Sequence, residues 1–473
     1  MSNEIPSPVA LMWFRRDLRL RDNPALVAAT KAGAGNVAGL FVLDEGLMAR
    51  SGKARNDFMA DALVQLDASM DGGLNLVKGS AVTEVVKLAK AVGATQVFAT
   101  EEFTPYAIAR DLEVAQALEA VGATLVHVDS PYMIKPGAIK NLSGQPYKVF
   151  GGFRKGWESL TAEFSVLAIP RVNWVLAASP KATISAPKAL RPSYFGPGAD
   201  SSAAVLPVAS EAAAKKLIAE FATRSSQYVE TRNVPGLSGT SRLSPYLRFG
   251  IVHPRQILDK VSRFDDGGRT FASELAWRDF YADVLYTNPQ SRYEALQPKM
   301  AKLRTDSDAQ AIKRFQAWTQ GQTGYPIVDA GMRQLLAEGW MHNRVRMITA
   351  SFLVKHLHID WRWGAEWFMW NLIDGDIASN QHGWQWVAGT GTDAAPFHRI
   401  FNPTLQAERF DPTGEYIKRY VPELKDVMVP ECLRPQGGTL LGGFDYVSPI
   451  VDQGVERNEA LARLAELKPG SLA

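Results

Sequence analysis

Tryptophan is concentrated in one stretch of this sequence, between residues 339 and 386. The tryptophans there are Trp340, Trp361, Trp363, Trp367, Trp370, Trp384 and Trp386. Ordinary cores use tryptophan sparingly, because each buried indole needs a hydrogen-bond partner for its N–H group. The cluster therefore predicts rings that stack on a flat ligand, pass electrons, or do both. Trp363, Trp367 and Trp370 are at i, i+4 and i+7, and this spacing predicts a stripe in the hydrophobic core.

A carboxylate, an indole and a guanidinium share one predicted helix face. Glu274, Trp277 and Arg278 are at i, i+3 and i+4, so their side chains project on the same side. Together they could bind a nucleobase through a hydrogen bond, a stacking ring and a positive charge. The same spacing also fits an ordinary buried indole flanked by a Glu–Arg pair, and both interpretations are open.

Two turns carry polar groups that could bind a ligand. Gly239-Thr240-Ser241-Arg242 offers hydroxyls, backbone N–H groups and a charge, which can hold a diphosphate, although such turns also cap helices. Asp374-Gly375-Asp376, followed by Asn380, has the form of a turn with a helix cap. Two carboxylates without a histidine or cysteine in register are weak ligands, so no metal site is predicted.

The chain is long enough to need more than one core. It has 473 residues, above the usual limit for a single domain. In residues 1–130, short apolar runs alternate with segments of helical spacing, which predicts an α/β domain with a doubly wound parallel sheet. The expected strands are Ala10–Phe14, Val37–Leu43, Leu74–Val77, Gln96–Ala99 and Thr124–Val128, and the expected helices are Pro24–Ala32, Asn56–Ser69, Ala81–Val92 and Ala107–Val121. Asp22-Asn23-Pro24 offers a capping residue followed by proline at the start of the first of these helices.

The rest of the chain changes character twice. Residues 131–205 are rich in proline, glycine, serine and alanine, which predicts a long surface connector with one short helix near Gly156–Glu163. In residues 206–473 the apolar spacing is helical, which predicts an all-α domain. Its expected helices are Ser210–Ser225, Pro254–Phe264, Phe271–Tyr286, Asp308–Gln320, Ile327–Ala337, Arg344–His356 and Gly364–Leu372.

Composition limits the partners and the location. The formal net charge is only +3, so a nucleic-acid surface would have to be a local patch. The single cysteine, Cys432, excludes an internal disulfide and suits a reducing cytosol. The sequence shows neither a secretory signal nor an apolar run of about 20 residues. We expect a cytoplasmic monomer without a membrane span.

Several strings resemble those of the DNA photolyase and cryptochrome family, and most closely its cyclobutane-pyrimidine-dimer photolyases. They are WFRRDLRLRDNPAL at 13–26, GTSRLSPYL at 239–247, and the tryptophan-rich stretch itself. The resemblance covers nearly the whole chain. It implies light-driven repair of pyrimidine dimers in DNA, in which a flipped-out dimer receives an electron from excited, reduced FAD.

The resemblance implies that the helical domain binds FAD. The matching residues are Tyr228, Arg232, Thr240, Ser241, Arg242, Leu243, Ser244, Phe271, Glu274, Arg278, Arg346, Asp374, Gly375, Asp376 and Asn380. In this assignment Asp374 pairs with Arg346 beside the isoalloxazine ring. Asp376 binds the ring edge, and Asn380 faces its N5 atom.

The resemblance also implies the substrate pocket and the catalytic residues. The residues matching substrate and DNA contacts are Glu274, Trp277, Arg278, Asn343, Arg344, Met347, Trp386 and Gln406. Glu274 would hydrogen-bond the dimer and steady its radical anion, and Trp277 would stack on it. The catalytic set is Glu274 and Asn380, with Trp384, Trp361 and Trp318 as an electron wire from the flavin to the surface.

A second, light-harvesting chromophore is implied in residues 1–130. Folate-binding relatives have an Asn-Glu pair before an Ala-Arg-Asp run, whereas this chain has Tyr106-Ala107 before Ala109-Arg110-Asp111. Pro105-Tyr106 is closer to deazaflavin-binding relatives. A methenyltetrahydrofolate, a deazaflavin and an empty site are all open.

Two other functions compete with repair. A blue-light cryptochrome receptor would share the fold and FAD, but such receptors often carry a long tail. Only a short segment follows the last matching motif, at residues 410–424, which favours repair. Without the resemblance, the aromatic-rich helices also fit a module that binds single-stranded nucleic acid by stacking.

Overall fold

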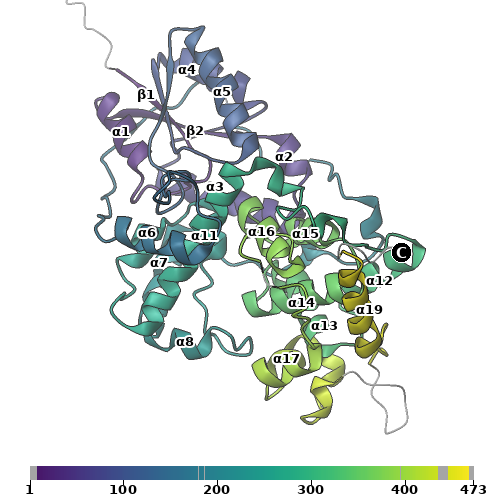
Figure 1. The fold of residues 1–473 in the computed structure, drawn as a ribbon. Helices are drawn as coiled ribbons and strands as arrows, with labels where there is room; N and C mark the ends of the chain where they lie inside the picture. The colour runs from purple at the N-terminus through teal and green to yellow at the C-terminus, as the bar shows by residue number, and fades with distance from the viewer. Residues whose placement is uncertain (1–7, 179–180, 186, 395, 435–445, 468–473) are drawn as a thin grey trace, which may run out of the picture.

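The computed structural model describes residues 8–178, 181–185, 187–394, 396–434 and 446–467. Figure 1 shows a part that contains the sheet at one end of the molecule and a larger helical part at the other. This is the α/β plus all-α class that the sequence predicts. Within the described ranges, no helix is long and apolar enough to cross a bilayer.

Five parallel strands run in the order β3-β2-β1-β4-β5, so the winding reverses between β1 and β4. They are β1 (Ala10–Trp13), β2 (Asn36–Leu43), β3 (Leu74–Lys78), β4 (Gln96–Ala99) and β5 (Thr124–His127). Each lies within about one residue of an expected strand, so that prediction is confirmed. A further short strand, β6 (Asn173–Trp174), pairs with the start of β2. The sequence did not predict that the connector would contribute to the sheet.

Alternate residues of β1 face two separate cores, as the two-residue period of a strand requires. Leu11 and Trp13 pack with α4 (Ala81–Val92) and α5 (Pro105–Glu119) on one face. Met12 packs on the other face with α1 (Pro24–Ala32) and α3 (Lys53–Ser69), and the short α2 (Glu45–Ala49) follows β2. The predicted cap is present, because the Asn23 side chain accepts a hydrogen bond from the N–H of Leu26.

The core around Met12 continues from the sheet into the helical part. Phe221, Tyr246, Phe271 and Phe280 belong to the same apolar cluster. A separate helical core surrounds Trp318, Trp367 and Trp384. Apolar packing therefore does not break at residues 130 or 205, and the domain limits placed there remain predictions.

Helices make up most of the chain after β5. They are α6 (Phe150–Leu160), α7 (Glu211–Ala222), α8 (Tyr228–Thr231), α9 (Ser244–Phe249), α10 (Pro254–Leu258), α11 (Asp266–Thr287), α12 (Ala309–Thr319), α13 (Pro326–Glu338), α14 (Asn343–Lys355), α15 (Trp361–Asn371), α16 (Ile377–Ala388), α17 (Pro403–Phe410), α18 (Glu415–Tyr420) and α19 (Gln453–Ala465). Every helix expected from apolar spacing is present, although α10 ends earlier than expected.

Two helices differ most from the sequence prediction. The connector helix α6 begins at Phe150 rather than near Gly156, because Phe150, Phe153 and Trp157 form a buried stripe along it. Apolar spacing did not identify α16, which carries three of the candidate site residues. Polar Gln381 and Gln385 are buried along with Trp384, so this helix is covered on most sides and lacks a simple amphipathic pattern.

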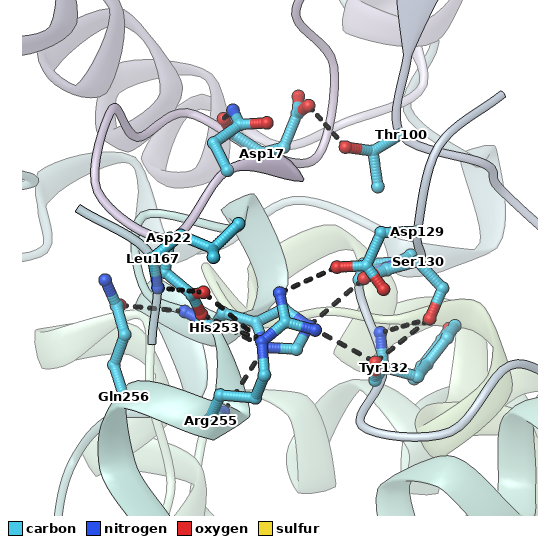
Figure 2. A network of polar contacts seen from close by, with 12 residues as sticks. Asp17, Asp22, Thr100, Asp129, Ser130, Tyr132, Leu167, His253, Arg255 and Gln256 are labelled. Atoms are coloured by element: carbon cyan, nitrogen blue, oxygen red, sulfur yellow. Dashed lines mark hydrogen bonds and ion pairs between the residues drawn. The ribbon is translucent and has the colours of Figure 1, made fainter. Parts of the chain in front are cut away.

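Buried charges join the loops at the strand ends to the helical part, and Figure 2 shows one group of them. Arg255 on α10 donates to Asp22 (Nε–Oδ2, 3.1 Å) and to Asp129 (Nη2–Oδ2, 2.7 Å). Arg16, which follows β1, pairs with Asp376 at the start of α16 (Nη2–Oδ2, 2.7 Å). We call Arg16, Asp22, Asp129, Arg255 and Asp376 the interdomain seam. These pairs hold the loop after β1 against α10 and α16.

His253 lies beside the seam as a neutral imidazole. Its Nδ1 accepts the N–H of Arg255, and its Nε2 lies 3.1 Å from the carbonyl oxygen of Ser130 and 3.2 Å from that of Tyr132. Burial and the nearby arginine charges hold the pKa of His253 well below its usual range. Nε2 therefore carries the proton and donates to these carbonyls, which ties α10 to the start of the connector.

Candidate active site

Asp374 is the meeting point of three segments. Its Oδ2 accepts from Arg346 on α14 (Nη2, 2.8 Å) and from Ser244 at the start of α9 (Oγ, 2.6 Å). The Ser244 hydroxyl in turn accepts from the indole N–H of Trp340 at 3.1 Å. Asp374 is buried, and its Oδ1 has no protein partner. The predicted Arg346–Asp374 pair is present, and it leaves one buried carboxylate oxygen free for a donor from outside the chain.

Asp376 has a structural task that the sequence prediction did not include. Its Oδ1 accepts the N–H groups of Ala378 and Ser379, which caps α16, while its Oδ2 pairs with Arg16. Burial alone would raise its pKa, but the charges of Arg16 and Arg248 outweigh burial and hold the pKa well below the usual range. The carboxylate is therefore ionised and already has protein partners, and its predicted contact with a ring edge stays a prediction.

The turn before α9 presents unused backbone donors. Among the described residues, the backbone N–H groups of Thr240, Ser241 and Arg242 have no protein acceptor. Arg242 has φ +54°, in the left-handed region that backbone anion-binding turns often include. Its guanidinium pairs with Glu338 (Nη1–Oε2, 2.6 Å) and lies 4.0 Å from the ring centre of Trp340. The turn could hold a diphosphate through its backbone, while the charge expected from Arg242 is already paired.

Aromatic residues of α8 and α11 pack together near the predicted cofactor turn. Tyr228 packs on Phe271 with ring centres 5.5 Å apart, and both rings are buried. The guanidinium of Arg232 lies 5.4 Å from the Tyr228 ring centre. Leu243 is buried beneath the turn, and the Ser241 hydroxyl accepts its N–H at 3.4 Å. The predicted cofactor residues Tyr228, Arg232 and Phe271 therefore lie together, and their contact with FAD stays a prediction.

On α11, Glu274 and Arg278 have different partners, although their spacing puts them on one helix face. Glu274 pairs with Arg232 (Oε1–Nη2, 2.7 Å), and burial raises its pKa. Arg278 instead donates to the carbonyl oxygens of Pro131 (2.9 Å) and Leu247 (3.2 Å). In the described part of the chain no Glu274–Arg278 pair forms, because Arg278 is directed at the connector. The Glu–Arg pair of the alternative interpretation is therefore absent here, and the predicted roles of Arg278 toward cofactor and substrate stay predictions.

The start of α14 presents an amide, a thioether and a neutral imidazole. His342 caps the helix through Nδ1, and burial with nearby arginine charges lowers its pKa to about 3. Its Nε2 is buried without a protein partner. Asn343 is exposed and Met347 is half-buried one turn later. Arg344 donates to Asn233 Oδ1 at 2.8 Å.

Helix α16 packs against both α11 and α14, the helices that carry other candidate residues. The Asn380 amide donates to the carbonyl oxygen of Ala365 (3.0 Å) and to Gln381 Oε1 (2.8 Å), so its nitrogen is fixed. Trp386 is half-buried, as is Gln406 on α17. Among the residues that the structure describes, no hydrogen bond, ion pair or ring contact joins the Gln406 side chain to another candidate residue.

The three tryptophans of the expected electron wire are all buried. Trp384 and Trp318 pack edge to face with ring centres 6.1 Å apart, while Trp361 lies under Arg362. Trp318 is fully buried, with its indole N–H on the Thr349 carbonyl oxygen at 3.1 Å. The prediction that the wire ends at the surface is wrong for Trp318, because it lies on the buried face of the amphipathic α12.

The tryptophan stripe on α15 behaves as predicted. Trp367 and Trp370 are buried, and Trp363 packs against the same core. Phe195 lies edge-on to Trp367, with ring centres 4.8 Å apart. These three rings therefore stabilise the fold.

Charged side chains fill the point where the winding of the sheet reverses. Arg15, after β1, pairs with Asp111 on α5 (Nη1–Oδ2, 2.6 Å), and Arg110 pairs with Glu102 (Nη2–Oε1, 3.0 Å). Burial opposes the charge of Asp111, but His127 and the two arginines hold its pKa well below the usual range. Tyr106 is half-exposed and donates to Asp44 Oδ2 at 2.6 Å. The charges here are paired with one another, and none identifies a second chromophore.

Sequence reasoning missed three arginines around the acidic pair. They are Arg16 in the seam, Arg55 on α3 and Arg248 on α9. Arg55 donates to the Leu372 carbonyl oxygen (3.0 Å), and Arg248 donates to that of Gly375 (2.8 Å). A Cβ at Gly375 would lie 2.9 Å from the Arg55 guanidinium, so a larger residue there would have to displace the end of that side chain. Arg16 lies in the string WFRRDLRLRDNPAL, but nothing in the sequence around Arg55 signals its position.

Comparisons with known proteins agree with this geometry. Residues 10–172 match the family described as "DNA photolyase", and residues 271–466 match "FAD binding domain of DNA photolyase". The chain is 36% identical to the deoxyribodipyrimidine photo-lyase of Halobacterium salinarum, over 96% of this chain and 98% of that one.

Solved structures extend the likeness to three dimensions. A class III photolyase from Agrobacterium tumefaciens superposes with a TM-score of 0.85 at 33% identity, covering 99% of each chain. A cryptochrome from Synechocystis superposes with a TM-score of 0.83 at 29% identity, covering 96% of this chain and 99% of that one.

Proposed function

We infer the function from one premise: this chain belongs to the DNA photolyase family. We take the protein to be a deoxyribodipyrimidine photo-lyase that uses light to split cyclobutane pyrimidine dimers in DNA. The observation that carries this is the convergence on Asp374 of the turn before α9, the start of α14 and the start of α16. That convergence supports the assignment of Ser244, Arg346 and Asp374 to one cofactor site.

The residues present fit FAD as the cofactor. The unpaired donors of Thr240, Ser241 and Arg242 suit a diphosphate, and the unpaired Oδ1 of Asp374 can accept from a ring N–H. When bound and reduced, FAD supplies the excited electron that opens the cyclobutane ring and takes it back afterwards. Arg346 neutralises Asp374, and the fixed Asn380 nitrogen leaves its Oδ1 to face the cofactor.

The substrate side depends on groups beside this region. Glu274 would hydrogen-bond the dimer, and burial raises its pKa while the charge of its partner Arg232 opposes that rise. Trp277, Asn343, Met347 and Trp386 remain half-buried or exposed and are available to a flipped base. Burial lowers the pKa of Arg344, and the charges of Arg232, Arg409 and Arg399 lower it further, so these arginines lie close enough together to support a local phosphate-binding patch.

The test is repair of a defined substrate. Purified protein with reduced flavin is irradiated with a duplex that carries one thymine dimer, and dimers are counted by chromatography. We expect repair in the light and none in the dark. Unchanged dimers with flavin bound and photoreduced would favour a cryptochrome receptor. A protein that purifies without flavin would favour a module that binds single strands.

The proposal also covers the protein's cellular location and its oligomeric state. It places the protein in the cytoplasm as a monomer that binds dimer-containing DNA. The single, buried Cys432 supports a reducing compartment. Light scattering of the purified protein with and without DNA tests the monomer.

A further inference from the structure

Phe150 and Trp277 form the closest ring stack in the described part of the chain. Their ring centres are 3.7 Å apart and their planes differ by 12°. Trp277 lies on α11 and is half-buried, whereas Phe150 is the first residue of α6 and only 7% exposed. One face of the Trp277 indole is therefore covered by a ring that comes from the connector.

Phe150 is held in place by the segment that follows α16. Its N–H donates to Asp393 Oδ2 at 3.0 Å, and the Thr392 hydroxyl donates to the carbonyl oxygen of Lys148 at 2.5 Å. Gln297 secures this segment by donating to the Gly391 carbonyl oxygen at 2.9 Å. Because α16 also carries Trp386, these bonds link the ring behind Trp277 to the helix that holds a second predicted pocket residue.

The row of rings continues from Trp277 to α16. Tyr281 lies one turn further along α11, with its ring centre 5.3 Å from that of Trp277, and His382 on α16 stacks on Tyr281 at 5.6 Å. His382 is fixed by its contacts with Ser291 Oγ (3.0 Å) and the Ala378 carbonyl oxygen (2.8 Å). We call Phe150, Trp277, Tyr281 and His382 the aromatic wall. Both ends of the wall are anchored, which restricts the indole between them.

We propose that Phe150 is a positioning residue, which holds the Trp277 indole in the orientation that stacks on a flipped pyrimidine dimer. This rests on the proposed function. A half-buried tryptophan without backing would populate several rotamers, and the substrate would have to select one of them. The stacked phenyl ring of Phe150 restricts Trp277 to one rotamer before the substrate binds. It acts through Trp277 and does not itself touch the dimer.

The test compares two leucine substitutions on one helix. Phe150→Leu removes the stacked ring, whereas Phe153→Leu removes a buried ring that packs on Phe280, with ring centres 5.2 Å apart. Phe150→Leu should weaken the Kd for a dimer-containing duplex about threefold to tenfold, the strength of one aromatic pair. Its affinity for undamaged duplex and its repair per absorbed photon at saturating substrate should not change. Phe153→Leu should leave the Kd for the dimer unchanged.

A double-mutant cycle separates positioning from general packing. In a Trp277→Leu background, Phe150→Leu should cause no further loss of dimer affinity. An equal loss in both backgrounds, or no loss in either, would overturn the proposal. If Phe150→Leu does not fold, Asp393→Ala replaces it, because this change removes the acceptor of the Phe150 N–H and should lower dimer affinity in the same direction. A wild-type protein that binds dimer-containing DNA without repairing it would overturn the proposed function and leave the positioning role standing.

Discussion

The interdomain seam and the aromatic wall both attach the active-site helices to other segments, but they do so by different forces. The seam uses buried, directional ion pairs such as Arg16–Asp376. The wall uses stacked rings, of which Trp277 keeps part of its surface exposed. Breaking a buried pair leaves an uncompensated charge, whereas removing a stacked ring leaves only lost apolar contact. We therefore expect substitutions that break the seam to act mainly on stability, and substitutions on the side of α11 that carries the wall to act mainly on substrate affinity.

The largest expected effect comes from breaking the seam. Arg16→Met should lower the free energy of unfolding by about 3–5 kcal/mol, because Asp376 then stays buried and charged. Urea unfolding monitored by fluorescence measures this. The exposed Arg21→Met is the control, with an expected change below about 0.5 kcal/mol. Adding Asp376→Asn to Arg16→Met should recover part of the loss, and a further loss would contradict the role of the lone charge.

The substrate side should respond in affinity rather than in stability. Glu274→Gln removes a charged partner of Arg232 and changes the group available to the dimer, and it should weaken binding of dimer-containing duplex about tenfold or more. Its free energy of unfolding should change by about 1 kcal/mol at most. Fluorescence anisotropy with labelled duplex gives the Kd, and the exposed Glu230→Gln on α8 is the matched control. If Glu274→Gln lowered the free energy of unfolding as much as Arg16→Met, the proposed difference between the seam and the substrate side would be wrong.

Asp279 on α11 is a buried carboxylate that differs from those in the seam. Its nearest ionic partner, Arg278, is 3.8 Å away, whereas Arg16 and Asp376 are 2.7 Å apart. It accepts from the Trp157 indole N–H (2.8 Å) and the Ile134 N–H (3.0 Å), and burial raises its pKa from 3.8 to about 6. Because the folded-state pKa is raised, this group stabilises the fold fully below pH 3.8, and the contribution is lost as pH rises through about 6.

Asp279→Asn should therefore flatten this part of the pH profile. Relative to the variant, the wild-type free energy of unfolding should fall by about 1.4 kcal/mol between about pH 5 and about pH 7.5. Urea titrations of both proteins at each pH measure the difference. Asp57→Asn, at a pair with exposed Lys53, provides the reference curve. Parallel curves for wild type and Asp279→Asn would contradict the assignment.

The smallest expected effect is on the salt dependence of DNA binding, through a predicted phosphate contact of Arg409. Arg409 is exposed on α17, and its charge is close enough to act on Arg344. Arg409→Ala should reduce the slope of log K against log salt by about 1 and weaken undamaged and damaged duplex alike. Anisotropy titrations at several salt concentrations measure the slope. Lys87→Ala, on α4 beside the far face of the sheet, should leave it unchanged.

Local patterns predicted most of the fold. The strands, the Asn23 cap and the buried stripe of Trp363, Trp367 and Trp370 all follow from residue type and spacing within one element. Helix α16 was missed, because a helix covered on most sides has no amphipathic period. The site residues came from the family resemblance, and their roles toward FAD and DNA remain predictions.

The sequence by itself determined which residues are available for the chemistry and which elements carry them, because periodicity and capping act over a few neighbouring residues. Only the tertiary structure decided which charges meet. Glu274 pairs with Arg232 rather than with Arg278 on its own helix, and Arg16 reaches Asp376 across a sequence separation of 360 residues. Such pairings depend on how whole elements pack, and no local pattern in the chain records that packing.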